Sequence, residues 1–341
     1  MSFIVRPAEW MTDGDALLKL LQENLSGSID RRRFDWLYRE CPSGEAVVWL
    51  AVQEGDGRLV GAAAAFPRRM NIAGQIKTGC VLGDFCISRD YRSLGPALQL
   101  QRKCLEAVMN GPFSAGYDLP STSMLAIYRR LGIKTEGRLV RMTKLLRSNA
   151  KIAARVRSRL LARGLSTVAN AVLSARTSSK LKSGATIESH DGRFGPEFTN
   201  LAARGANPLG MSVERSADYL NWRYLDHPQH KYEILTARRG ARLQGYLVFL
   251  QQGTAANVVD CFAETADVRG DLIRGVVNLQ QTRKGESVNM AVLESHSLCA
   301  ELRDLGFRSR ESVPAVFLEP KRTSSAAAGT EWYLLDGDRE S

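Results

Sequence analysis

The run Asp84-Phe85-Cys86-Ile87-Ser88-Arg89-Asp90-Tyr91-Arg92-Ser93-Leu94-Gly95-Pro96-Ala97 decides the fold of this chain. Its first residues are typical of an apolar strand, and Pro96 suits the first turn of a helix, where a missing N–H costs nothing. Backbone N–H groups and the helix dipole at such a start attract anions. Gly95 lets the backbone approach a phosphate closely. The run therefore predicts a strand, a tight turn and a helix that together cradle a phosphate.

The spacing of Arg92, Gly95 and Ala97, R-x-x-G-x-A, resembles the pyrophosphate-binding motif of the GCN5-related N-acetyltransferases, the GNAT superfamily. The surrounding order of elements supports the resemblance, because a strand and a helix precede the motif and an antiparallel meander leads into it. Further on, Tyr128-Arg129-Arg130-Leu131-Gly132-Ile133 stands where the family has Y-x-x-x-G-F. The resemblance covers nearly all of the first half of the chain.

Three positions depart from the family pattern. Ser93 stands where the family commonly has Gly, Ile133 where it has Phe, and Ser121 where many members have a cofactor-contacting Asn. None of these changes removes the predicted cradle.

The chain also repeats itself weakly, and internal repeats decide domain organisation. Each half carries W-x-Y-x-x-x-P, then a hairpin pattern with Arg-Leu-x-Gly, then an acidic residue inside an apolar strand, then a Leu-Gly step. The main landmarks are Trp36, Tyr38, Pro42 and Asp84 in the first half and Trp222, Tyr224, Pro228 and Asp260 in the second. No R-x-x-G-x-A can be aligned in the second half, which reads Asp267-Val268-Arg269-Gly270-Asp271-Leu272-Ile273 at that place.

These observations predict an α/β protein of two tandem GNAT-like domains, each with a mixed, mostly antiparallel central sheet flanked by helices. We expect the domain with the acyl-CoA loop at residues 1–146, a basic amphipathic linker at 147–184 and a degenerate GNAT-like domain at 185–338. A length of 341 residues agrees with two domains, because single cores stop growing near ~250–300 residues.

The composition excludes a disordered, a collagen-like or a disulfide-dense protein. Hydrophobic residues at 44% and charged residues at 24% are typical of a globular chain. No stretch approaches the ~20 apolar residues of a membrane span, and the first residues show no secretion signal. We therefore expect a cytoplasmic protein without a transmembrane segment, and we expect its six cysteines to be reduced and mostly buried.

The net charge of +11 is concentrated in one segment. Residues 138–182 contain twelve Lys and Arg residues and no acidic residue. Apolar residues recur there at helical spacing, so a connecting helix with a solvated basic face is one interpretation. The other is a docking surface for an acidic partner such as acyl carrier protein. No RNA-recognition, zinc-finger or helix-turn-helix signature accompanies the cations, so we do not expect a nucleic-acid partner.

The resemblance implies acyl-CoA, most simply acetyl-CoA, as co-substrate and direct attack of an amine on its thioester. The first half contains no histidine, so a base there must be a carboxylate, a tyrosine or a relayed water. Asp84 is the candidate base, or else a carboxylate that ties a loop or binds a cationic substrate. Tyr128 resembles the acid that protonates the leaving thiolate in the family, or else packs beneath the Leu-Gly turn.

The same resemblance implies the residues that bind the co-substrate and the acceptor. The residues expected to bind acyl-CoA are Phe85, Cys86, Ile87, Arg92, Ser93, Leu94, Gly95, Pro96, Ala97 and Ser121. Arg33, Trp36 and Tyr38 lie where the family recognises acceptors, although the repetition of the two aromatics at Trp222 and Tyr224 favours a shared core role. We expect no metal, because His227 and His230 lack a third clustered ligand.

The function predicted from the sequence is an N-acyltransferase that moves an acyl group from acyl-CoA to a primary amine of an amino sugar or amino acid. Tandem GNAT proteins of this kind are similar to proteins associated with exopolysaccharide assembly. One alternative is a long-chain N-acyl amino acid synthase that uses acyl carrier protein, and a second is Fem-type aminoacyl transfer from tRNA. A third is a non-catalytic assembly or regulatory protein that keeps the GNAT fold.

Overall fold

A computed structural model describes residues 2–91, 94–147, 181–205, 210–318 and 331–340 of the chain. The elements of the first half are β1 (Phe3–Pro7), α1 (Trp10–Asn24), α2 (Arg31–Tyr38), β2 (Val47–Gln53), β3 (Leu59–Ile72), β4 (Gln75–Ile87), η1 (Arg89–Tyr91), α3 (Leu94–Asn110), β5 (Gly116–Asp118), α4 (Thr122–Arg130) and β6 (Gly137–Leu145). None of the described helices is long and apolar enough to cross a membrane.

The second half repeats this order with a few additions. Its elements are β7 (Thr186–Ser189), α7 (Pro196–Gly205), β8 (Met211–Val213), α8 (Ala217–Leu220), η3 (Asn221–Leu225), β9 (Glu233–Arg239), β10 (Arg242–Gln252), β11 (Ala255–Ala263), α9 (Ala266–Thr282), β12 (Ser287–Leu293), α10 (Ser297–Asp304), β13 (Arg308–Leu318), β14 (Trp332–Tyr333) and η4 (Asp336–Asp338). In both halves a three-stranded meander leads into a helix, a strand, a second helix and a long strand, as the sequence predicted. The predicted helical linker at 147–184 falls mostly on residues 148–180, which lie outside the described residues.

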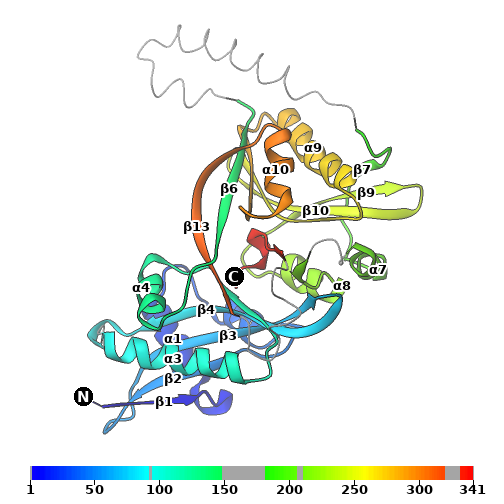
Figure 1. Ribbon diagram of the computed structural model, residues 1–341. Helices are drawn as coiled ribbons and strands as arrows, with labels where there is room; N and C mark the ends of the chain where they lie inside the picture. The colour runs from blue at the N-terminus through cyan, green and yellow to red at the C-terminus, as the bar shows by residue number, and fades with distance from the viewer. Residues whose placement is uncertain (1, 92–93, 148–180, 206–209, 319–330, 341) are drawn as a thin grey trace, which may run out of the picture.

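The strands form one continuous sheet that joins the two halves. Their order is β1-β2-β3-β4-β5-β13-β6-β12-β11-β10-β9-β7. Neighbours on this path are antiparallel except for the parallel pairs β4–β5 and β11–β12. Figure 1 shows β6 and β13 side by side as long curved strands that run between the two halves.

The last strand of each half is exchanged with the other half. β6 pairs with β12 of the second half, with Val140 opposite Val292, and β13 pairs with β5 of the first half, with Val316 opposite Asp118. In the sheet, therefore, the last strand of each half pairs with a strand of the other half. Each half needs a strand of the other to satisfy its edge, and backbone groups at an uncovered edge invite non-native pairing.

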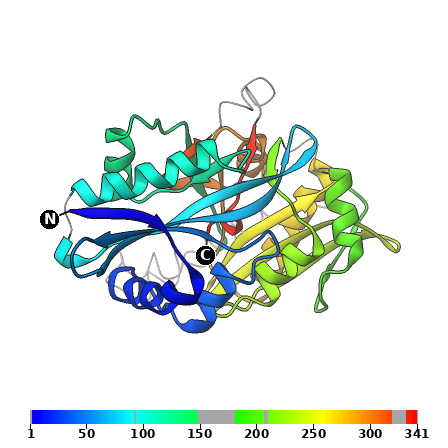
Figure 2. The same cartoon turned by 90° about the horizontal axis from the view of Figure 1, so that it is seen from below.

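Helices cover both faces of the part of the sheet that belongs to the first half. Figure 2 shows α3 on one face and α1 with α2 on the other. Leu100, Cys104 and Val108 on α3 are buried, which confirms the apolar helical pattern of this segment. All six cysteines are buried and free, as expected.

Two tryptophans at repeated positions hold the halves together. The rings of Trp36 and Trp222 stack with centroids 4.7 Å apart. Each indole Nε1 donates to the backbone oxygen of the other residue, over 2.9 Å from Trp36 and 3.0 Å from Trp222. The guanidinium groups of Arg68 and Arg223 lie over the Trp222 and Trp36 rings respectively. This reciprocal contact places the repeated aromatic in the core, as its repetition favoured.

Candidate functional site: the cleft between β4 and β5

A cleft of about 470 Å³ opens where β4 and β5 separate. The two parallel strands pair at Cys80 with Gly116 and at Val81 with Tyr117. Beyond these pairs, residues 82–85 of β4, the last residue of β5, Asp118, and residues 119–121 after it line the cleft. Parallel strands that separate in this way leave backbone groups free to bind an extended ligand. We call this space the β4–β5 cleft.

Asp84 sits at a bulge of β4. The pairing between β3 and β4 shifts register between Ala62 and Ala64, so that Ala64 faces Gly83 and Ala62 faces Cys86. Asp84 has a φ of 46°, in the left-handed region that few residues other than Gly, Asn and Asp adopt. Bulges re-aim side chains next to functional sites, and strained backbone concentrates there.

Two residues of α2 hold the Asp84 carboxylate. The Tyr38 hydroxyl donates to Asp84 Oδ2 over 2.8 Å, and Arg33 Nη1 lies 3.8 Å from the same oxygen. Burial raises the pKa of Asp84 above its ordinary value, against the opposing effects of Arg33 and the Tyr38 hydrogen bond. The predicted residues Arg33, Tyr38 and Asp84 are thus brought together, with Arg33 and Asp84 lining the cleft.

Asp118, at the end of β5, is a second carboxylate in the cleft that sequence reasoning missed. Tyr128 on α4 donates its hydroxyl to Asp118 Oδ2 over 2.6 Å, and Gln101 Nε2 donates to the Tyr128 oxygen over 3.2 Å. Burial raises the pKa of Asp118 to about 7, opposed by the Tyr128 hydrogen bond and assisted by Glu340. An acid directly after a short apolar strand was the only signal in the sequence.

Glu340 brings a third carboxylate from the far end of the chain. Its side chain packs so closely on Gly83 that a Cβ at Gly83 would lie 2.6 Å from Glu340 Cγ. Burial raises the pKa of Glu340, and the nearby Asp84 carboxylate raises it further. No sequence pattern could have linked position 340 with position 83, because only the tertiary fold brings them together.

The predicted co-substrate residues fall in three places. Phe85 and Ser121 line the cleft, and Ser121 also caps α4 by accepting the Met124 N–H over 3.3 Å. The side chains of Cys86 and Ile87 are buried in the sheet and do not line the cleft. Their backbone groups remain the predicted contacts to a pantetheine arm.

The predicted phosphate loop leads into α3, which begins at Leu94. Gly95 is exposed, and a Cβ there would meet nothing within 4 Å, so its backbone is open to a ligand. Pro96 and Ala97 are buried behind it. Arg92, Ser93 and the side chain of Leu94 lie outside the described residues.

The positions of Trp36 and Tyr128 in the structure change the roles predicted for them. Trp36 does not contact the cleft, because its side chain is fully buried against Trp222; its assignment to the acceptor site is corrected to the contact between the halves. Tyr128 is also fully buried and lies behind Asp118, which separates its hydroxyl from the cleft. Burial, with the Asp118 charge, raises the pKa of Tyr128 well above its ordinary value.

No group of three or more His, Cys, Asp or Glu side chains among the described residues could hold a metal ion. The His227 ring stacks on that of His230 and contacts the Trp36 ring at a tilt of 53°. Burial, with the charge of Arg223, lowers the pKa of His227 to about 3.

Solved structures share this architecture, although no family model and no curated protein matches the sequence. A probable N-acyltransferase from Enterococcus faecalis is 11% identical, with a TM-score of 0.68 over 93% of this chain and 72% of that one. A GCN5-related N-acetyltransferase from Anabaena variabilis is 14% identical, with a TM-score of 0.66 over the same shares. A third, from Kribbella flavida, is 12% identical, with a TM-score of 0.61 over 92% of this chain and 71% of that one.

These similarities show that the chain has the fold of the GNAT superfamily, a mixed α/β sheet flanked by helices, which confirms the fold class predicted from the phosphate loop and its surroundings. At identities of 11–14% they show the fold alone.

Proposed function

We propose that the protein is an N-acyltransferase that moves an acyl group from acyl-CoA to a primary amine in the β4–β5 cleft. One observation carries the proposal: the cleft opens where β4 and β5 separate, directly before the predicted phosphate loop, and a buried carboxylate stands at its bulge. The fold of the solved GNAT structures supports the same reaction class.

The reaction forms a C–N bond and breaks a C–S bond. The amine nitrogen attacks the thioester carbon, the CoA thiolate leaves, and the nitrogen loses a proton to a base. Asp84 and Asp118 both line the cleft, and burial raises the pKa of both, that of Asp118 to about 7, near the pH at which a base is most effective. The base that takes the proton from the amine can then give it to the thiolate, and Tyr128 orients the Asp118 carboxylate by donating a hydrogen bond to it.

The three carboxylates favour an acceptor that approaches as an ammonium ion. Among the described residues that line the cleft, Asp84, Asp118 and Glu340 are accompanied by one cationic side chain, Arg33, which pairs with Asp84. Opposite charges raise the local concentration of a ligand and steer its approach. An amino sugar or the amino group of an amino acid fits this environment.

Acetyl-CoA in the cytoplasm is the simplest donor, and acyl carrier protein is the alternative. Of the basic segment 138–182, residues 148–180 lie outside the described residues, and three of its cations are in β6. Arg141 pairs with Glu311, Arg138 donates to Ser312, and Lys144 Nζ donates to the Leu305 oxygen over 2.6 Å. These three bonds occupy cations that a docking surface would use.

Calorimetric titration with acetyl-CoA and longer acyl-CoAs tests the proposal. We expect micromolar binding that the double variant Arg92→Glu, Gly95→Glu abolishes, because carboxylates in the loop repel phosphate. Asn110→Glu is the control for an added carboxylate, since it makes the same charge change as Gly95→Glu alone at the exposed far end of α3, about 22 Å away at ~1.5 Å per residue.

The preferred chain length distinguishes acetyl transfer from long-chain chemistry. Absence of binding to any acyl-CoA would overturn the proposal and favour acyl carrier protein, tRNA or a structural role. Binding that survives in the double variant would place the co-substrate elsewhere.

A further inference from the structure

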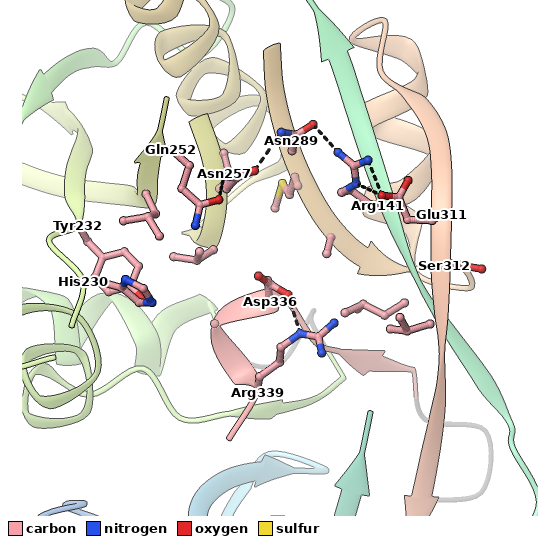
Figure 3. Close-up of a pocket in the computed structure, with 18 of the residues that line it drawn as sticks. Arg141, His230, Tyr232, Gln252, Asn257, Asn289, Glu311, Ser312, Asp336 and Arg339 are labelled. Carbon is pink, nitrogen blue, oxygen red and sulfur yellow. Dashed lines mark hydrogen bonds and ion pairs between the residues drawn. The ribbon is translucent and has the colours of Figure 1, made fainter. Parts of the chain in front are cut away.

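A second cavity, of about 340 Å³, lies in the second half of the protein. Its upper walls come from β6, β10, β11, β12 and β13, its floor from η4 and Arg339, and one side from Tyr232 and His230 (Figure 3). It shares no lining residue with the β4–β5 cleft. We propose that this second-half cavity binds a neutral, hydroxyl-rich small molecule of monosaccharide size and that the bound molecule fixes the C-terminal segment beneath it.

A directional chain of hydrogen bonds crosses the wall of the cavity. Arg141 Nη1 donates to Asn289 Oδ1 over 3.2 Å, Asn289 Nδ2 to Asn257 Oδ1 over 2.9 Å, and Asn257 Nδ2 to Gln252 Oε1 over 2.9 Å (Figure 3). Hydrogen bonds in such chains polarise one another. The chain of hydrogen bonds therefore ends at Gln252. Because Gln252 Oε1 accepts a bond, the amide nitrogen of Gln252 becomes a stronger donor.

Side chains of this polarity are costly in the middle of a sheet. Asn289 is 6% exposed and sits on a central strand, where an apolar residue would pack without desolvating an amide. Thr143 donates a further bond to Asn289 Oδ1 over 2.8 Å, so the amide is fixed in one orientation. Packing alone does not explain why a polar side chain is buried here, whereas a ligand that exchanges hydrogen bonds with this wall does.

Most of the charges around the cavity are already paired or buried. Arg141 Nε donates to Glu311 Oε1 over 2.9 Å, and Arg339 Nε donates to Asp336 Oδ1 over 2.6 Å. The third guanidinium of the lining, that of Arg223, is 2% exposed and donates to the Gly337 oxygen, so the lining offers donors and acceptors together without a strong field of one sign. Hydroxyl groups both donate and accept, and they match such a surface better than an anion or a cation does.

An aromatic wall completes the match. The rings of His230 and Tyr232 lie 6.0 Å apart at an interplanar angle of 80° and line one side of the cavity. Their apolar faces and polar edges suit a ring molecule with C–H faces and a hydroxyl rim. A cavity of this volume holds one such ring with its first waters.

The floor of the cavity belongs to the segment that ends in the β4–β5 cleft. Arg223 Nε donates to the Gly337 oxygen over 2.8 Å and fixes η4 from beneath. Asp336, Gly337 and Arg339 line the second-half cavity, and the next residue, Glu340, lines the cleft. A molecule bound above the floor therefore holds the segment that carries Glu340.

Calorimetry with three sugars of one ring type tests the ligand class. We expect glucose to bind with a dissociation constant of about 1 mM, the affinity of a dozen ligand atoms at ordinary efficiency. Glucuronate and glucosamine, its anionic and cationic counterparts, should bind at least about fivefold more weakly, because the accessible charges of the lining already have partners. Tighter binding of either charged sugar, or no binding of glucose, would overturn the proposal.

Two variants locate the binding site. Ala291→Phe places a ring in the cavity and should abolish glucose binding, and Gln252→Leu removes the end of the hydrogen-bond chain and should weaken it. Gln252 is exposed, so its loss leaves folding intact. Asn278→Leu, at an exposed position of α9, is the control and should bind glucose as the wild type does. Equal glucose binding by all four proteins would refute the site.

Hydrogen exchange tests the effect on the floor without any assay of activity. Saturating glucose should slow exchange of the backbone amides of residues 335–340 by at least about twofold, because a fixed segment opens less often. The same amides should not respond to glucose in Ala291→Phe. Unchanged exchange in the wild type at saturation would contradict the proposed hold on the segment.

Discussion

The two halves of the molecule place an aspartate at the same strand position and use it differently. Asp84 lines an open cleft, held by Tyr38 and by a distant Arg33. Asp260 is fully buried, accepts the Tyr246 hydroxyl over 2.9 Å and lies 3.4 Å from Arg215 Nη2. Arg215 also binds Asp338 over 2.8 Å, so the C-terminal segment closes the second site. The same strand thus supports a site in one half and a buried ion network in the other.

The first turn of α3 and the first turn of α9 differ in the same way as the two aspartates, because the first is open and the second is occupied. Gly95 leaves an open backbone at the start of α3. At the corresponding start of α9, the Thr265 side chain accepts the Val268 N–H, and Asp267 adds a carboxylate to the first turn. Arg269 is bound to Glu301. A phosphate would meet carboxylate instead of free N–H groups there, so the comparison predicts one acyl-CoA site, in the first half.

The largest effect expected from this comparison is on turnover. Asp84→Asn should lower kcat by about 10²–10⁴-fold, the usual contribution of a general base, and leave acetyl-CoA binding unchanged. Asn tolerates the positive φ at this bulge, so the backbone should be retained. The measurement is steady-state kinetics on an amine found by screening. Loss of co-substrate affinity in step with kcat would assign Asp84 a structural role.

The corresponding change in the second half should act on stability. Asp260→Asn weakens the pairing of the buried Arg215, and breaking a buried pair costs about 3 kcal/mol at the low end, which applies here because Asp338 remains. Urea unfolding measures the change in free energy. If Asp260→Asn leaves stability intact but reduces acyl transfer, the second half contains a functional site and the comparison fails.

The pH dependence should identify Asp118. A base acts when deprotonated, so activity should rise with pH through the pKa of about 7 and then level off. Asp118→Asn should remove this rise and lower the plateau by about tenfold or more. The measurement is the profile of kcat against pH for the wild type and for Asp118→Asn. An unchanged profile in the variant would assign the titration to another group, with Asp84 and Glu340 next to be tested.

The smallest effects are expected on the free energy of unfolding, and they should be equal for the two tryptophans that join the halves. Trp36→Phe and Trp222→Phe each remove one indole N–H and leave a buried carbonyl without its partner, which costs about 1–2 kcal/mol. Both variants should keep the wild-type KM for the amine, because neither ring lines the cleft. A raised KM in Trp36→Phe alone, at equal stability, would restore Trp36 to the acceptor site.

The sequence by itself determined the local features of this protein. Apolar patterns predicted the strand at Asp84, Pro96 predicted a helix with this residue in its first turn, and the matched W-x-Y spacings predicted the repeated order of elements. Each depends on residues close together in the chain, where steric and hydrogen-bond preferences act directly. The pairing of Asp84 with Tyr38 joined two residues that the sequence had already singled out.

Only the tertiary structure decided which halves the last strands complete and which side chains meet. A strand pattern states that β6 and β13 exist, but an apolar period of two is the same whichever edge they pair with. Asp118 acquires its raised pKa from burial, which depends on the packing of α3, α4 and the C-terminal segment around it. Glu340 reaches Gly83 only because the exchanged strands carry the end of the second half to the first, and so the cleft is finished by a residue that no local pattern could select.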